Sequence, residues 1–444
     1  MRKTCMVSLS LLILFFLLTV SAFSSEELTS WLKRMPITFS GYTNSETLIN
    51  FPALIVLEET DAGDGFKYAD FLSENHGDLR FSAGDKFTLL DYEVDTWDDA
   101  SGKSYVWVKI PELASSTVIY VFWGKAGVEV PPCTTNGSVW IQDFTGVWHL
   151  NEESGITAFD SLRNIHPGVI MGNTVTIGIN GKIGKAYEFS ANNGYVRTDI
   201  VHNSTVTISA WATSVGSGLL WAREGHKPDL LFASGKIALN WGDGLQNPFC
   251  DQPADVNEWH HYVTVLDAAQ FKASLYIDGV LASDTATYRN PSGAPPFTIS
   301  TDWPNDAWTG KIDEFRTANV VRSAAWIWAS WKNQGANSDF IAYGIPELQE
   351  LPDIINYRHG ATNVTVNSAW LNGTLVSSGT SGTSVSVFWG TNDGGDYPDN
   401  WMCTNTWHAP QSPGEFSHKI SGLSEDCLYY YRFMAKNDSG TSWA

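Results

Sequence analysis

Five short motifs, spread over residues 147–316, decide the fold of this chain. In order along the sequence they are VWHLN (147–151), DS (160–161), WHHYV (259–263), LYIDG (275–279) and GKIDEFR (310–316). Around them, runs rich in Val, Ile, Thr, Tyr and Trp are separated by short clusters of glycine and other turn residues. This pattern is typical of an all-β protein, in which short strands are connected by tight turns.

The alternation of polar and apolar residues supports the same fold class. It is clearest at 206–211 (VTISAW) and 384–389 (SVSVFW), as expected of strands that bury one face. Turn clusters such as DAGDG (61–65) and NDGGD (392–396) lie between strands of this kind. Helix is expected only as a short terminal turn over 323–332, held against a sandwich by its tryptophans.

The order of the five motifs resembles the laminin-G-like, concanavalin A-type jelly roll. The resemblance implies a sandwich of two antiparallel sheets over residues 136–344, a length that suits this architecture. It also implies a class of function. The fold is best known as an extracellular binder of sugars or proteins and, more rarely, as a glycosidase.

Residues 23–135 resemble a different module, the domain of unknown function numbered 2341, which is a β-rich part of exported bacterial proteins. The motifs that carry this resemblance are WLKRMPI (31–37), NFPALIV (50–56), GDLRF (77–81), LDYEVDTW (90–97), VWVKIP (106–111) and IYVFWG (119–124). Because the motifs keep their order over this length, the resemblance is specific. It implies no activity.

A third module is expected over 353–444, after a proline-bearing linker at 345–352. Its closing half resembles a fibronectin type III domain, in which a tyrosine at the position of Tyr429 bonds back to the preceding corner. The last strand of that fold should begin near Ala444, so a longer chain and a different closure are both left open. The expected architecture is three β-sandwich modules.

The first 22 residues have the pattern of a secretory signal peptide. Arg2 and Lys3 precede an apolar run over 6–20, and small residues lead to an expected cleavage after Ala22. No later run approaches the roughly 18 apolar residues of a membrane-spanning helix. The net charge of −21 argues against a nucleic-acid partner, which requires a basic surface. We expect a secreted or cell-surface protein, with the periplasm as a further location.

Four cysteines follow the expected signal peptide: Cys133, Cys250, Cys403 and Cys427. They are too few and too scattered for a disulfide-scaffolded fold, and no C-x-x-C pair suggests zinc or redox chemistry. Cys403 and Cys427 fall in one expected module. They are the candidate disulfide in an oxidising compartment, with free thiols as the alternative.

The carboxylates and histidines offer no anchor for an enzyme. Glycosidases of the concanavalin A type carry paired carboxylates on one strand, about 5 to 5.5 Å apart in retaining enzymes. The nearest string, EVDTWD (93–98), lies outside the jelly roll and is expected to form a solvated strand face. Asp313 and Glu314 are adjacent and should point apart on a strand. His260 and His261 should also face opposite ways, so packing is expected rather than a shared metal ion.

The jelly-roll resemblance implies a calcium site, because domains of this kind often hold one Ca²⁺ ion with oxygen ligands. Asp160 and Asp313 match acidic positions of the family pattern. The alternative is turn capping by Asp160 and a surface salt bridge from Asp313. No catalytic residue is assigned.

Some of the 20 tryptophans are candidates for stacking on sugar rings. Trp221, Trp241, Trp303 and Trp308 neighbour turn residues inside the jelly-roll module, where a ligand could reach them. The alternative for each is packing in the core of the sandwich.

We therefore expect an exported, non-catalytic protein that binds a glycan or surface polymer through loops and one face of the jelly roll. One alternative is a glycosidase with a divergent carboxylate pair. Another is a structural or adhesion protein whose jelly roll binds a protein partner. Because a fold alone does not determine function, this expectation rests on the family resemblance.

Overall fold

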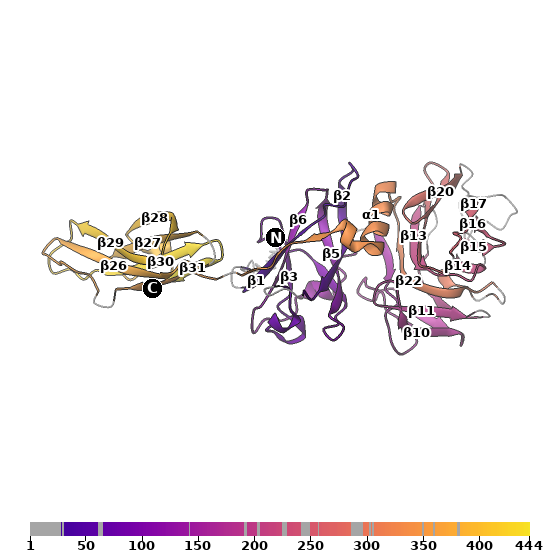
Figure 1. Cartoon of the computed structure of the whole chain (residues 1–444), viewed down its shortest axis with the longest axis horizontal. Helices are drawn as coiled ribbons and strands as arrows, with labels where there is room; N and C mark the ends of the chain where they lie inside the picture. Colours follow the sequence, from indigo (N-terminus) through magenta and orange to yellow (C-terminus); the bar gives the residue numbers. More distant parts are fainter. Residues whose placement is uncertain are drawn as a thin grey trace, which may run out of the picture.

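The computed structural model describes residues 28, 31–60, 65–141, 143–190, 193–201, 205–223, 229–240, 249–255, 257–285, 296–301, 303, 306–348, 350–357, 360–379 and 382–444. The expected signal peptide at 1–22 and Trp241 lie outside these residues. Strands dominate, and they form three sandwich modules in a row along the longest axis of the molecule (Figure 1). The predicted all-β class is confirmed.

The first module has two sheets that pack face to face around an apolar core. Its strands are β1 (Lys33–Thr38), β2 (Leu48–Glu58), β3 (Arg80–Ala83), β4 (Tyr92–Thr96), β5 (Lys103–Leu113) and β6 (Val118–Trp123). β1, β6 and β3 lie in one sheet, and β2, β5 and β4 form the other. Within β2, Ile55 faces the core of this module while Leu54 packs in a separate cluster with the jelly roll. A strand that is covered on both faces has little room for polar residues, which explains its apolar sequence.

The jelly roll follows, with every strand pair antiparallel. Its strands are β7 (Phe144–Trp148), β8 (Thr157–Ala158), β9 (Gly168–Met171), β10 (Val175–Asn180), β11 (Lys185–Ser190), β12 (Tyr195–Arg197), β13 (Val206–Ala212), β14 (Gly218–Arg223), β15 (Asp229–Ala233), β16 (Lys236–Asn240), β17 (Phe249–Asp251), β18 (His260–Asp267), β19 (Lys272–Ile277), β20 (Val280–Thr285), β21 (Phe297–Ser300) and β22 (Thr309–Ala318). One sheet runs β10-β11-β22-β13-β18-β19-β20 with β7 paired to β22, and the other runs β17-β16-β15-β14-β21-β12-β9-β8. The first and last of the five sequence motifs are neighbours, because Trp148 of β7 pairs with Phe315 of β22.

After the jelly roll the chain returns to the first module and completes it. The returning elements are α1 (Ala324–Gly335), α2 (Asn337–Phe340), β23 (Ala342–Tyr343) and β24 (Glu347–Leu348). β23 and β24 both pair with β1, and Trp326 and Phe340 are part of the first module's core. The jelly roll is therefore inserted into the first module, and the structure differs from the expected boundaries at 344 and 345–352.

Helix α1 agrees with the helix expected at 323–332. Ser323 caps it, since its hydroxyl accepts a hydrogen bond from the backbone N–H of Trp326 at 3.1 Å. The helix lies between the two sandwiches (Figure 1), and Asn333 on it donates to the backbone carbonyl of Leu54 on β2. Neither helix in the described part of the chain has the length and apolar character needed to cross a membrane.

The third module is a separate sandwich with its own core (Figure 1). Its strands are β25 (Asp353–Asn356), β26 (Ser368–Ser377), β27 (Thr383–Gly390), β28 (Cys403–Gln411), β29 (Gly414–Ser421), β30 (Tyr430–Asn437) and β31 (Gly440–Trp443). The sheets run β25-β26-β29 and β28-β27-β30-β31. The hydroxyl of Tyr429 accepts a hydrogen bond from the backbone N–H of Ser424 at 3.2 Å, which is the corner contact that the sequence predicts. β31 pairs with β30 just before Ala444.

Candidate functional site

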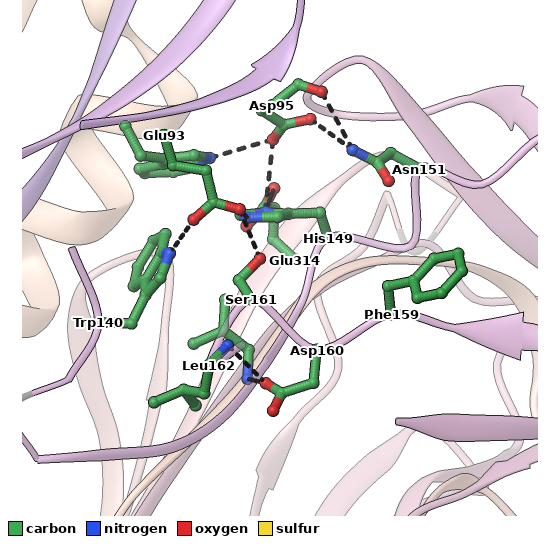
Figure 2. A network of polar contacts seen from close by, with 12 residues as sticks. Glu93, Asp95, Trp140, His149, Asn151, Phe159, Asp160, Ser161, Leu162 and Glu314 are labelled. Carbon is green, nitrogen blue, oxygen red and sulfur yellow. Dashed lines mark hydrogen bonds and ion pairs between the residues drawn. The ribbon is translucent and has the colours of Figure 1, made fainter. Parts of the chain in front are cut away.

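The first module and the jelly roll meet along a buried junction with an apolar part and a polar part. The apolar part is one cluster of side chains: Leu54, Trp107, Val139, Trp140, Val147 and Ile183. The polar part lies beside it and joins β4 of the first module to β7 and β22 of the jelly roll (Figure 2). We call this polar part, made of Glu93, Asp95, His149, Glu314 and Arg316, the junction cluster.

His149, directly after β7, is the centre of the junction cluster. Its Nδ1 lies 2.8 Å from Oε1 of Glu314 and 3.4 Å from Oδ2 of Asp95. Its Nε2 lies 3.6 Å from Oε1 of Glu93. The imidazole therefore contacts three carboxylates from two modules (Figure 2), while only 6% of the side chain is exposed.

The side chains of Glu93 and Asp95 reach the junction because successive residues of β4 point to opposite faces of the sheet. Tyr92 and Val94 face the core of the first module, so the two acidic residues between and after them face the other way. The predicted solvated face is wrong at this point, since the side chain of Asp95 is 1% exposed and that of Glu93 is 16% exposed. The jelly roll covers a face that would be open to solvent if the first module stood alone.

A bulge in β22 directs Glu314 to the same place. The register between β13 and β22 shifts at this point, and Glu314 has a φ of 52°, a left-handed conformation that is rare for this residue type. Ile312 and Phe315 both face the jelly-roll core, so Asp313 and Glu314 lie together on the opposite side. The prediction that these two carboxylates point apart is therefore wrong, because it assumed a regular strand.

Further donors hold each carboxylate of the cluster in a fixed orientation (Figure 2). Asn151 Nδ2 donates to Asp95 Oδ1 at 2.9 Å, and Trp107 Nε1 donates to Asp95 Oδ2 at 3.0 Å. Trp140 Nε1 and the Ser161 hydroxyl both donate to Glu93. These indole, amide and hydroxyl groups belong to both modules, so the network spans the junction.

Arg316 completes the cluster on the side of Glu314. Its Nη2 donates to Glu314 Oε2 at 2.5 Å, and its guanidinium lies 4.1 Å from the ring centre of Trp107 and 4.7 Å from that of Trp140. A cation held between two aromatic rings gains a cation–π interaction that is strongest when water is excluded.

Burial and neighbouring charges move the pKa values of the cluster in opposite directions. Burial raises the pKa of Asp95 to about 6, although His149 opposes the shift. Burial alone would lower the pKa of His149, but the Glu314 and Asp95 carboxylates raise it well above its usual value. Burial would raise the pKa of Glu314, yet His149 and Arg316 bring it down to about 2. The neighbouring carboxylates thus favour the charged form of the imidazole in this ion network.

The two aspartates expected to hold calcium have other roles in the structure. Asp160 Oδ1 accepts from the backbone N–H groups of Val147 and Leu162, and its Oδ2 accepts from that of His166. Oδ2 of Asp313 accepts from the backbone N–H groups of two residues before β11. Calcium requires six to eight oxygen ligands, and among the described residues neither aspartate belongs to a group of ligand atoms with metal-ligand spacing. Among the described residues, the one group with metal-ligand spacing is Asp95, His149 and Glu314.

The four candidate tryptophans are distributed differently from the prediction. Trp221 and Trp308 are fully buried in the jelly-roll core, so neither presents a ring face to a ligand. Trp303 is half-buried, and Trp241 lies outside the described residues. A tryptophan near the end of a strand can point into the core and still be close to turn residues in the sequence. The sequence pattern therefore does not distinguish it from a tryptophan on a loop.

The remaining candidate residues are two cysteines of the third module and two histidines of the jelly roll. Cys403 and Cys427 are free and exposed, so the predicted disulfide is not formed in this structure. His260 Nδ1 lies 2.6 Å from Asp278 Oδ2, whereas His261 packs against Trp211. Burial, followed by the nearby Arg316, lowers the pKa of His261 to about 3.

Two cavities bear on what the junction can bind. The one that touches the cluster, at Glu314 and Arg316, has a volume of about 30 Å³, which is water-sized. A larger cleft of about 600 Å³ is lined by residues of both modules. It is lined by Leu54, Val56, Glu58, Lys103 and Tyr105 of the first module, by Lys182 and Ile183 of the jelly roll, and by residues after α1.

Comparison with known proteins supports the two-module interpretation. A model described as the concanavalin A-like lectin/glucanases superfamily matches residues 190–328. A model of a domain of unknown function, DUF2341, matches residues 75–151. The chain therefore contains a concanavalin A-like domain and a DUF2341 domain, and the junction cluster has members from both. No curated protein matches the chain.

Three solved structures illustrate the range of similar chains. Domain 4 of the extracellular arabinanase AbnA from Geobacillus stearothermophilus, solved with arabinotriose, is 19% identical over 42% of this chain and 97% of its own, with a TM-score of 0.36. The binding domain of Paraclostridial Mosquitocidal Protein 1 is 12% identical over 53% and 64%, with a TM-score of 0.35. Trypanosoma rangeli sialidase is 14% identical over 56% and 43%, with a TM-score of 0.35.

Proposed function

We propose that this chain is an exported, non-catalytic carbohydrate-binding protein that binds its ligand through the central jelly roll together with the first module. One observation carries the proposal. The chain contains a concanavalin A-like domain, and the carboxylates of the junction cluster are buried where a substrate would not reach them. The signal-peptide pattern at 1–22 supports export. The corner contact of Tyr429 supports a fibronectin type III-like third module.

The closed cluster argues against the glycosidase alternative. A glycosidase needs two carboxylates on either side of a sugar ring, one of them free to donate a proton. In the junction cluster the carboxylates of Asp95 and Glu314 are each 1% exposed and face the same imidazole. The adjoining cavity of about 30 Å³ is far smaller than a sugar ring. These groups hold two modules together rather than contact a substrate.

The cleft of about 600 Å³ is the favoured binding site. Ligand sites often lie between domains and have volumes of roughly 300 to 1,000 Å³. Its floor is apolar at Leu54 and Val56, and the half-buried Tyr105 offers a ring for the apolar face of a sugar. At the rim, Glu58 and Lys103 lie 3.7 Å apart and provide an acceptor and a donor for hydroxyl groups.

A glycan array, with release of reducing sugar measured in parallel, tests the proposal. Binding without turnover is the expected result, and Tyr105→Ala should weaken binding by about tenfold or more through loss of the stacking surface. Tyr397→Ala is the matched control, because that tyrosine is 70% exposed on the third module. Turnover of a bound glycan, or equal binding by both variants, would contradict the proposal. Unchanged thermal unfolding of Tyr105→Ala would show that the cleft variant is folded.

A further inference from the structure

The junction cluster has the arrangement of a metal-binding site. Asp95, His149 and Glu314 each offer one ligand atom, and these atoms all lie within 4.8 Å of one another. The shortest separations both involve Nδ1 of His149, at 2.8 Å from Glu314 Oε1 and 3.4 Å from Asp95 Oδ2. Two ligands of a tetrahedral metal ion with bonds of about 2.1 Å are themselves about 3.4 Å apart. The three atoms therefore surround a point that a metal ion could occupy after small side-chain movements.

Each candidate ligand also has a second polar atom that would not bind the metal ion. In metal sites, hydrogen bonds to such atoms hold the ligand side chains in place. Asn151 donates to the second oxygen of Asp95, and Arg316 donates to the second oxygen of Glu314. Nε2 of His149 is buried without a hydrogen bond, and the nearest carboxylate oxygen is that of Glu93 at 3.6 Å. A histidine that binds a metal ion through one nitrogen commonly directs the N–H of the other to a carboxylate. The second oxygens of Asp95 and Glu314 have such partners, and the ligand oxygen Oδ2 of Asp95 also accepts a hydrogen bond from Trp107 Nε1 at 3.0 Å.

The acidic side chains of the cluster outnumber its basic ones. Three carboxylates, those of Glu93, Asp95 and Glu314, face the two cationic side chains of His149 and Arg316. Oδ1 of Asp313, next to Glu314, is also buried without a hydrogen bond. Excess negative charge away from water is unfavourable unless it is compensated. A divalent ion bound between these side chains would supply positive charge where the acidic groups gather.

We propose that Oδ2 of Asp95, Nδ1 of His149 and Oε1 of Glu314 bind a divalent transition-metal ion, zinc or manganese, that joins the first module to the jelly roll. One imidazole and two carboxylates suit these ions, whereas calcium and magnesium prefer oxygen ligands alone. The ligands come from β4, from the residue after β7 and from β22, so the ion clamps the two modules to each other.

Metal content and thermal unfolding of the full chain test the proposal. The background is the Cys403→Ser/Cys427→Ser variant, because exposed thiols bind zinc on their own. After treatment with a chelator, we expect one equivalent of Mn²⁺ or Zn²⁺ to bind and raise the midpoint of unfolding. Calcium should give no comparable rise. Co²⁺ bound at the same site should give the visible absorption of a site with a nitrogen ligand.

Two isosteric variants and one control locate the site. Asp95→Asn and Glu314→Gln keep the shape of the cluster and should weaken Mn²⁺ binding by about 100-fold or more, since each removes an anionic ligand. His166→Gln removes an exposed histidine that also pairs with a carboxylate, Asp199 at 2.7 Å, and should leave Mn²⁺ binding unchanged. If the chelated parent chain binds no Mn²⁺ or Zn²⁺, or if Glu314→Gln binds as tightly as the parent, the proposal is overturned. The measurement on the parent chain decides even if a variant fails to fold.

Discussion

The two connections between neighbouring modules differ in kind. The first module and the jelly roll share a buried apolar cluster, an ion network and a helix, and the chain crosses between them twice. The third module is joined by a single crossing of the chain, which leaves the first module after β24 at Leu348. The ion pair between Arg34 and Glu347, at that exit, is partly exposed. Modules of one chain can therefore form a single structural unit, or can be joined by one connecting segment alone.

The largest effect is expected from breaking the ion network. Glu314→Ala leaves Arg316 buried without its carboxylate and removes the shortest of the three carboxylate contacts of His149, so we expect it to lower the free energy of unfolding by about 3 to 5 kcal/mol. Urea denaturation, monitored by tryptophan fluorescence, measures this change. A loss of less than about 1 kcal/mol would mean that the cluster does not hold the junction together.

A smaller effect is expected at the contact between α1 and β2. The side chain of Asn333 accepts from the backbone N–H of Leu54 at 2.7 Å and donates to its carbonyl at 3.0 Å, and it is fully buried. Asn333→Leu leaves a buried N–H unpaired, so we expect a loss of about 1 to 3 kcal/mol in urea denaturation. The control is Lys332→Ala, whose partner Asp339 is exposed, and it should change stability by less than about 1 kcal/mol. Equal effects of the two variants would contradict a specific role for Asn333.

The His260–Asp278 pair should contribute a pH-dependent stability that is independent of the junction cluster. The hydrogen bond to Asp278 raises the pKa of His260, although burial opposes it. A raised pKa means that the stabilisation is complete below the unfolded value of about 6.5 and is lost as the pH rises through the folded value. His260→Gln should therefore be less stable than the parent by about 1 to 2 kcal/mol at pH 5.5, with the difference shrinking toward pH 9. A difference that does not depend on pH would show that the pair contributes through packing.

The smallest effect is expected at the connection to the third module. Glu347→Ala removes the partner of Arg34, a pair 2.7 Å apart in which the glutamate is 44% exposed. We expect a change of less than about 1 kcal/mol in the unfolding of the two-module body, because exposed ion pairs are screened by solvent. A change comparable to that of Glu314→Ala would remove the contrast between the two connections.

The sequence predicts the fold of each module better than it predicts how the modules are connected. Motif order predicts the jelly roll, the pattern at 323–332 predicts α1, and Tyr429 makes its expected corner contact. The return of β23 and β24 to β1 could not be predicted. It depends on pairing between strands of two residues and a partner at the other end of the chain, and so short a segment carries no period.

The junction cluster escaped prediction for a related reason. His149 and Glu314 are 165 residues apart, and Asp95 belongs to another module, so no spacing in the sequence links them. Asp313 and Glu314 appeared divergent because a regular strand was assumed, and a bulge is not visible in the residue pattern. One signal was available. Glu93 and Asp95 at alternate positions, and Asp313 and Glu314 at adjacent ones, lie in expected strands, and such carboxylates require partners if a neighbouring module covers them.

The insertion of the jelly roll has a mechanical consequence. Lys33 at the start of β1 pairs with Leu348 at the end of β24, so the chain enters and leaves the first module at adjacent points. Tension applied through these points would separate β24 from β1 one hydrogen bond at a time and would bypass the jelly roll, which is enclosed between them. Force spectroscopy should record a weak opening of the first module before the inserted module extends. A first event with the full contour length of the jelly roll would contradict this path of force.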